Sequence, residues 1–113
     1  MSDDCLFCRI VGGTIPATFV ARNEHGVAVR DLNPQAPSHL LVIPRRHVAS
    51  LADASDGAEL GALLLLAAEV ARAEGLAETG YRVVANTGTD GGQTVPHLHL
   101  HVLGGRMMQW PPG

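Results

Sequence analysis

The segment HLHLHVL, residues 97–103, decides the fold of this chain. Histidine alternates with apolar residues there, and successive side chains of a β-strand point to opposite faces. The pattern therefore predicts a strand over 97–103 with three imidazoles on one face and Leu98, Leu100 and Val102 in the core. Neighbouring imidazoles lie about 6.5 Å apart on such a face, close enough to act on one phosphate group. A zinc site is the alternative, because imidazoles on a shared face also suit zinc.

The remaining sequence predicts an α+β fold with a mainly antiparallel sheet. A helix is predicted over 57–74, capped by Asp56 and closed by Gly75, and a short one over 5–11. Apolar runs between turns predict further strands over 19–22, 27–32, 39–44 and 81–86. Five strands with one long helix apart from them indicate a single α+β domain over residues 1–113.

Composition and charge limit the classes of partner. The 113 residues are 46% hydrophobic and 17% charged, which is sufficient for a folded core. The net charge is −3 and no basic cluster exceeds Arg45–Arg46, which argues against a nucleic-acid polymer as the main partner. The acidic start and the short apolar stretch 60–68 resemble neither a secretory signal nor a membrane span. We therefore expect a cytoplasmic protein without a membrane partner.

Two motifs near the ends of the chain add chemistry. Three glycines in the loop 87–92 allow backbone N–H groups to approach an anion, and Gln93 and Thr94 add side-chain donors just before the histidines. Next to three aligned imidazoles, this loop favours phosphate binding over an ordinary turn. Cys5 and Cys8 form a C-x-x-C, which in a reducing compartment suggests metal or redox chemistry over a structural disulfide.

Four blocks in order resemble a known family. HLHLHVL is similar to the histidine triad motif of the HIT superfamily. CLFCRIVGGTIPA (5–17) resembles the N-terminus of this family, and RDLNPQAPSHLLVIPRRH (30–47) resembles its central strand region. The Hint branch in particular is resembled by GYRVVANTGTDGGQTVPHLHLHVLGGR (80–106) and WPPG (110–113). The resemblance implies the HIT fold, a five-stranded mainly antiparallel sheet with one long and one short helix. It also implies a homodimer whose two sheets join into one larger sheet.

The resemblance implies a purine nucleoside phosphoramidase, which cleaves the P–N bond of adenosine or guanosine 5′-phosphoramidates. His99 would attack the α-phosphorus, giving a nucleotidyl-histidine that water hydrolyses. His101 would donate a hydrogen bond to the developing negative charge, and His97 and Thr94 would complete the catalytic set. Thr94 stands where the branch more often has Ser, and Pro96 where it often has an aromatic residue. Substrate preference near the leaving group is therefore open.

Family positions also suggest how a nucleotide and a metal would be held. Asn86, Gln93 and Thr94 match phosphate-contacting positions, and Asp31 matches a residue that binds ribose hydroxyls. The apolar residues at base-pocket positions are Leu6, Phe7, Ile10, Val29, Leu32 and Leu41. From the residues alone, Asp31 and Asn86 equally suit turns and the apolar set equally suits the core.

A structural zinc is implied at Cys5, Cys8, His47 and His97, and a redox C-x-x-C is the alternative. His39 matches a position that orients the site. Trp110 matches a residue of a tail that crosses to the partner subunit's active site.

Two rival functions stay open. A dinucleoside polyphosphate hydrolase of the Fhit branch also has a Gln before its triad, as Gln93 is here, but has a Pro-Arg pair where this chain has Gly104-Gly105-Arg106. A nucleotide sensor or scaffold with incidental hydrolysis is the second rival.

Overall fold

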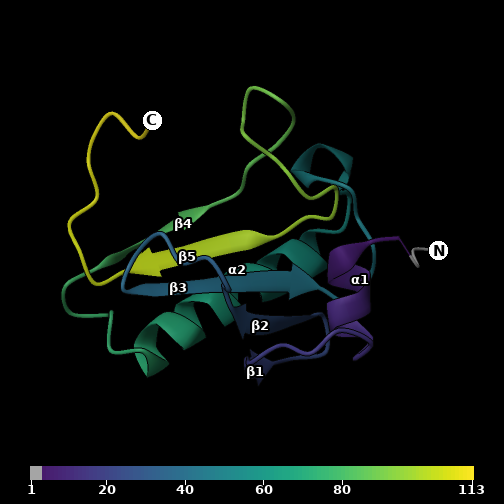
Figure 1. The fold of residues 1–113 in the computed structure, drawn as a ribbon, viewed down its shortest axis with the longest axis horizontal. Coiled ribbons are helices and arrows are strands. Elements are labelled where there is room, and N and C mark those ends of the chain that lie inside the picture. Colours follow the sequence, from purple (N-terminus) through teal and green to yellow (C-terminus); the bar gives the residue numbers. More distant parts are fainter. Residues whose placement is uncertain (1–3) are drawn as a thin grey trace.

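The computed structural model describes residues 4–113. Along the chain these form α1 (Leu6–Val11), β1 (Phe19–Arg22), β2 (Gly26–Arg30), β3 (Ser38–Pro44), the 3-10 helix η1 (Leu51–Asp53), α2 (Gly57–Ala73), β4 (Tyr81–Val84) and β5 (Leu100–Gly104). The five strands make one sheet in the order β1-β2-β3-β5-β4, and every neighbouring pair is antiparallel. The predicted α+β class and antiparallel sheet are confirmed (Figure 1).

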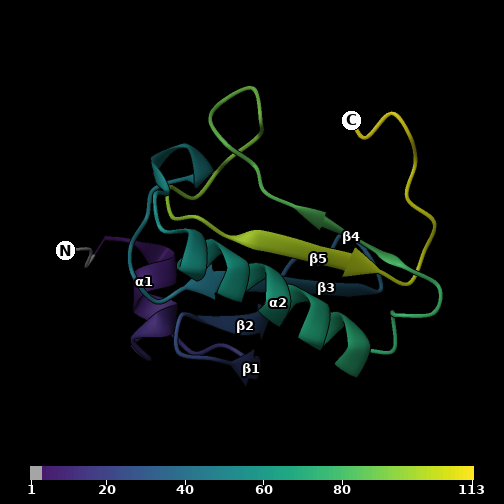
Figure 2. The ribbon, with the colours of Figure 1, turned by 180° about the vertical axis from the view of Figure 1, so that it is seen from behind.

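The two helices pack on opposite faces of the sheet. Figure 2 shows α2 lying along one face, whereas α1 lies near the end of the sheet from which β5 begins. Successive side chains of β3 point to opposite faces of the sheet. Leu40 and Val42 pack with α2, whereas Leu41 and Ile43 pack with α1. The sheet is thus buried on both faces at its centre.

Helix α2 begins and ends where the sequence predicts, to within one residue. The Asp56 carboxylate accepts from the Glu59 backbone N–H at 3.1 Å and so caps the first turn. Gly75 has a φ of 77°, and the Leu76 N–H donates to the Ala71 carbonyl at 2.9 Å, the Schellman end that a glycine permits. No helix of residues 4–113 has both the length and the hydropathy needed to cross a bilayer.

The triad segment differs from its prediction, because β5 begins only at Leu100. Pro96 has no N–H to donate, and the Leu98 N–H donates to the Val48 carbonyl at 2.6 Å and not to a neighbouring strand. The inward and outward alternation nevertheless continues, because Leu98, Leu100 and Val102 are all buried in the core beside α2. The three imidazoles consequently lie on the other face.

Two other predicted strands are too long. The strand predicted over 27–32 ends at Arg30, because the Asp31 carboxylate accepts from the Asn33 backbone N–H at 2.8 Å and turns the chain. The strand predicted over 81–86 ends at Val84, and the Asn86 side chain instead donates to the Gly91 carbonyl at 2.7 Å. In both cases a short polar side chain bonds to a nearby backbone group and ends the ladder.

Candidate active site

A cavity of about 250 Å³ lies between α1 and the face of the sheet that carries the imidazoles. Ten of the predicted site residues line it: Leu6, Phe7, Ile10, Val29, Asp31, Leu32, Leu41, Thr94, His99 and His101. Sequence analysis missed Ile15, Pro16, Ala17, Arg30 and Val95, which also line it. Residues 15–17 end the first block that resembles the family, but the path of the chain after α1 is what shows that they form part of the wall.

The geometry around His99 leaves one ring nitrogen available for attack. His99 Nδ1 lies 2.8 Å from the backbone carbonyl oxygen of His97. A carbonyl oxygen only accepts, so Nδ1 carries the proton and Nε2 keeps its lone pair in the neutral ring. The Phe7 ring packs edge-on against the imidazole, with centroids 4.8 Å apart, and the side chain is buried. The neutral His99 ring is therefore held with its lone pair on Nε2, the form that can attack an electrophile.

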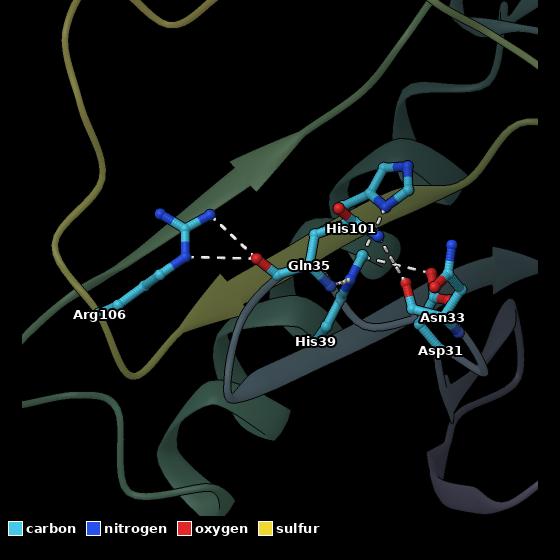
Figure 3. A network of polar contacts seen from close by, with 6 residues as sticks. All are labelled: Asp31, Asn33, Gln35, His39, His101 and Arg106. Carbon is cyan, nitrogen blue, oxygen red and sulfur yellow. Dashed lines mark hydrogen bonds and ion pairs between the residues drawn. The ribbon is translucent and has the colours of Figure 1, made fainter.

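His101 has the opposite proton arrangement, which a chain of hydrogen bonds determines (Figure 3). The Gln35 backbone N–H donates to His39 Nδ1 at 2.9 Å, so His39 carries its proton on Nε2. His39 Nε2 lies 2.9 Å from His101 Nδ1, which must then accept. The proton of a neutral His101 is consequently on Nε2. The site thus pairs a ring with a free lone pair and a ring with a free N–H.

Burial keeps these supporting imidazoles neutral. Desolvation, followed by the positive charge that His99 and His39 would carry, lowers the pKa of His101 to about 4. Desolvation also lowers the pKa of His39, against the opposing effect of the Asp31 carboxylate. Near pH 7 each ring therefore has a single N–H, and its position is set by the hydrogen bonds.

Asp31, His39 and His101 form a group with metal-ligand spacing, but its proton arrangement argues against a metal. Asp31 Oδ2 lies 3.4 Å from His39 Nε2, and the three ligand atoms lie within 4.8 Å of one another. A metal would need a lone pair on His39 Nε2. That nitrogen must keep its proton because Nδ1 already accepts from the Gln35 amide. The group is better suited to orienting His101 than to binding a cation.

The glycine loop is braced by two of the predicted phosphate ligands. Gln93 accepts from the Gly88 N–H at 3.0 Å and donates to the Ala49 carbonyl at 2.8 Å. Together with the bond from Asn86 to Gly91, these contacts tie both ends of the loop. Neither Asn86 nor Gln93 lines the cavity, so their contact with phosphate stays a prediction.

A second group gathers Cys5, Cys8, His47 and His97, as the sequence predicts. His97 Nδ1 lies 3.2 Å from Cys5 Sγ, 3.4 Å from Cys8 Sγ and 3.2 Å from His47 Nδ1, and Cys8 Sγ lies 3.3 Å from His47 Nδ1. Tetrahedral zinc at ordinary bond lengths separates two nitrogens by about 3.4 Å and a nitrogen from a sulfur by about 3.6 Å. The four side chains are thus arranged nearly as a zinc ion requires.

The state of His97 also fits a metal ligand. Its Nε2 lies 3.0 Å from the Pro44 carbonyl oxygen, so Nε2 carries the proton and Nδ1 presents a lone pair to the group. The ring is fully buried, and desolvation is the main reason that its pKa is lowered. A neutral ring is the form that binds a cation. The described residues therefore fit zinc by distance, donor type and proton position.

Trp110 does not line the cavity and is 80% exposed. The C-terminal segment that follows β5 runs at the opposite end of the sheet from α1 (Figure 1). Arg82 holds this segment by donating to the Gln109 carbonyl at 2.9 Å, and its guanidinium carbon lies 5.9 Å from the Trp110 ring centroid. A contact of Trp110 with the site of a partner subunit stays a prediction.

Comparison with known proteins agrees with the triad geometry. The family model of the HIT domain matches residues 12–108. The chain belongs to the HIT family. An uncharacterised HIT-like protein of Synechococcus elongatus is 52% identical over 115 aligned residues, covering all of both chains.

Solved HIT structures have the same fold. The HIT family hydrolase of Legionella pneumophila Philadelphia 1 superposes with a TM-score of 0.94 at 52% identity, covering 97% of this chain and 100% of the other. The structure of a zinc-bound histidine triad family protein from Mycobacterium smegmatis superposes with a TM-score of 0.84 at 34% identity, covering 94% and 78%. The HIT fold, and a likeness to hydrolases of this family, are thereby shown for this chain.

Proposed function

We propose that this protein is a purine nucleoside phosphoramidase that hydrolyses adenosine or guanosine 5′-monophosphoramidates. The observation that carries the proposal is the paired proton arrangement in the cavity. His99 has its lone pair on Nε2, while the neutral His101 beside it has its proton on Nε2. The ring centroids of His99 and His101 are 5.0 Å apart, so both can reach one phosphoryl group.

The reaction follows from these two rings. His99 Nε2 attacks the α-phosphorus, and the P–N bond breaks with its electron pair going to the amine, which takes a proton from solvent. His99 then carries a nucleotidyl group and a positive charge, which the His97 carbonyl stabilises through Nδ1–H. His101 donates its N–H to the phosphoryl oxygen as negative charge develops there. Water next attacks the phosphorus and returns His99 with its lone pair, releasing the nucleoside monophosphate.

The cavity offers suitable partners for each part of a nucleotide. Its wall beside α1 is formed by apolar side chains, which would take the flat face of a purine. The Asp31 carboxylate would accept from ribose hydroxyls at the mouth of the same cavity. Thr94 would donate its hydroxyl to the phosphate, and the loop that Asn86 and Gln93 brace would add backbone donors.

Zinc at Cys5, Cys8, His47 and His97 completes the proposal. None of these four residues lines the cavity. The group is linked to the cavity through the His97 carbonyl, which accepts from His99 Nδ1. Its bound ion would hold α1 against the triad segment and take no part in P–N cleavage. The cytoplasm, where thiols stay reduced, is the compartment that suits such cysteine ligands.

We also propose a homodimer. An open groove of about 750 Å³ lies beside the edge strand β4, lined by residues 79–82 and 105–108. Large apolar side chains are more than half exposed both on the C-terminal segment (Met107 and Trp110) and on α2 (Leu64 and Leu65). A second copy joined along β4 would extend the sheet and bring Trp110 to its partner. Sedimentation of the intact chain tests this, and a single monomeric species at micromolar concentration would contradict it.

The test of the activity is release of a fluorogenic amine from adenosine 5′-phosphoramidate by the wild type and by His99→Ala. We expect turnover by the wild type, and a loss of at least about 10³-fold in the variant, because the covalent step has no other nucleophile. Trapping of a radiolabelled nucleotidyl group on the wild-type protein, absent in His99→Ala, would identify the intermediate.

The same assay separates the rival functions. Diadenosine tri- and tetraphosphate are offered as competing substrates in the same reaction. Preferred cleavage of these would place the protein with the dinucleoside polyphosphate hydrolases. Nucleotide binding without turnover of either substrate would leave a sensor or scaffold, and the phosphoramidase proposal would be wrong.

A further inference from the structure

The proton position on His101 depends on the loop between β2 and β3. This loop spans residues 31–37, and Pro34 and Pro37 in it have no N–H groups. The Gln35 N–H is the group that fixes His39, and through it His101. Within the loop, the Gln35 side chain donates to the Asn33 carbonyl at 3.0 Å. A shift of the Gln35 backbone would remove the bond that selects the proton position.

Arg106 holds this backbone from a distant part of the chain (Figure 3). Its guanidinium donates twice to the Gln35 carbonyl oxygen, from Nε at 3.3 Å and from Nη2 at 3.0 Å. The two residues are 71 positions apart, and Arg106 lies two residues beyond the end of β5, the strand that carries His101. Arg106, which holds the loop, and His101, whose proton position the loop sets, are therefore connected through the same strand.

The turn that presents Arg106 is shaped to meet the loop. Gly105 has a φ of 92°, and a Cβ atom there would lie 2.8 Å from the Pro37 side chain. Only glycine combines this backbone conformation with so close an approach. The C-terminal turn thus contacts the loop at two points, through Gly105 on Pro37 and through Arg106 on Gln35.

We propose that Arg106 is a positioning residue for His101, the ring that donates its N–H to the phosphoryl oxygen. By holding the Gln35 carbonyl it keeps the Gln35 N–H on His39 Nδ1, and so keeps the His101 proton on Nε2. The inference rests on the proposed function only for its effect on turnover. The position of the proton on His101 is a property of the resting protein and can be measured without any substrate.

A matched control is available in Arg45. Its guanidinium also donates twice to one backbone carbonyl, that of Asn23, from Nε at 3.0 Å and from Nη2 at 2.9 Å. Like Arg106, it is exposed, and Asn23 belongs to the turn between β1 and β2. Arg45→Ala therefore removes the same kind of contact without touching the loop 31–37.

The experiment is nitrogen-15 NMR of the imidazole rings in Arg106→Ala, Arg106→Lys, Arg45→Ala and the wild type at pH 7, with His101→Asn to assign the signal. We expect His101 in the wild type to be protonated on Nε2. In Arg106→Ala the ratio of the two tautomers should shift toward Nδ1–H by up to about tenfold, the effect of about one hydrogen bond. Arg106→Lys, which keeps the charge but not the fork, should lie between them, and Arg45→Ala should match the wild type.

Kinetics of the same variants provide the second measurement. Arg106→Ala should lower kcat by up to about tenfold, with KM within about twofold of the wild type, because the donor and not the base pocket is affected. Thermal unfolding checks that each variant is folded. An unchanged His101 tautomer in Arg106→Ala would overturn the inference whatever the activity. If the wild type lacks turnover while the tautomer shifts as expected, the proposed function fails and the positioning role stands.

Discussion

The proton position on each histidine of the site traces to a backbone group, directly for His97, His99 and His39 and through His39 for His101. His99 and His97 each donate a ring N–H to a backbone carbonyl. His39 accepts from a backbone N–H at Nδ1 and donates its Nε2–H to His101 Nδ1. Imidazole can place its proton on either nitrogen, so identical side chains take different chemical roles here. The rings differ because their backbone neighbours differ.

Acid should destabilise the protein through His101. Burial lowers its folded pKa to about 4 from the ordinary value of 6.5, so between these values the unfolded chain binds more protons and stability rises with pH. We expect the contribution of His101 to the free energy of unfolding to fall by about 2 kcal/mol between pH 7 and pH 5, at about 1.4 kcal/mol per pKa unit below 6.5. Denaturant titrations at both pH values measure this.

His101→Asn is the control for that change. Asn cannot titrate in this range, so the variant should lose less stability over the same interval. The wild type and the variant are compared by how much their free energy of unfolding changes between pH 7 and pH 5. The difference separates the effect of His101 from that of the cysteine and histidine side chains of the proposed zinc site. Equal changes would show that His101 is not kept neutral by burial.

At the scale of elements, close packing of α2 on β2 depends on one small residue. A Cβ atom at Gly26 would lie 2.6 Å from the Leu63 side chain and 2.9 Å from the Ile43 carbonyl oxygen. Leu63 is buried on α2, and Ile43 is buried on β3. The first residue of β2 therefore lies directly beneath the helix, and a larger residue there would push the helix from the sheet.

We expect Gly26→Ala to destabilise the fold by about 1–3 kcal/mol, the usual cost of overpacking. Gly57→Ala is the matched control, because a Cβ there meets nothing within 4 Å. It should change the free energy of unfolding by less than about 0.5 kcal/mol. Denaturant unfolding monitored by circular dichroism compares them, and equal effects would mean that the contact at Gly26 is relieved by small shifts.

The elements were largely predictable because each has a local signal. The cap at Asp56, the stop at Gly75 and the alternation through Leu98, Leu100 and Val102 all act within a few residues. The late start of β5 was not predictable, since alternation is the same in a strand and in an extended segment without strand partners. The acceptor of the Leu98 N–H is the Val48 carbonyl, which lies 50 residues away in the sequence, so no local pattern predicts this bond.

The site was likewise predictable only where its residues form a local pattern or match a family position. The triad and the C-x-x-C give local patterns, and the family resemblance supplied the pocket residues that line the cavity. The bond from Arg106 to Gln35 joins residues that no short pattern connects, and an arginine after Gly-Gly has no distinctive signal. Long-range contacts with backbone groups are invisible to residue patterns, because every residue has the same backbone.

For the molecule as a whole, the cysteine and histidine group joins three distant segments. Cys5 and Cys8 lie on either side of the start of α1, His47 follows β3, and His97 precedes β5. The same α1 supplies Leu6, Phe7 and Ile10 to the cavity wall. The group therefore connects the stability of the fold to the shape of the nucleotide pocket.

Zinc should accordingly stabilise the protein and tighten nucleotide binding together. At free zinc a thousandfold above its Kd, linkage predicts about 4 kcal/mol of stabilisation. We expect chelation to lower the melting temperature, speed hydrogen exchange in α1 and weaken AMP binding measured by calorimetry. Cys8→Ser should show a much smaller response to zinc and chelator. If melting and AMP binding do not change on chelation, the site does not hold zinc.

The bond from His99 to the His97 carbonyl has a consequence for attempts to redesign this centre. A carbonyl belongs to the main chain, so any amino acid placed at position 97 would still present it to His99. A protein engineer could thus exchange the side chain at 97 for another metal ligand, or remove it, without deleting the acceptor that orients the attacking ring. The hydrogen bond that orients His99, the nucleophile that we propose, therefore comes from the backbone of residue 97 and not from its side chain.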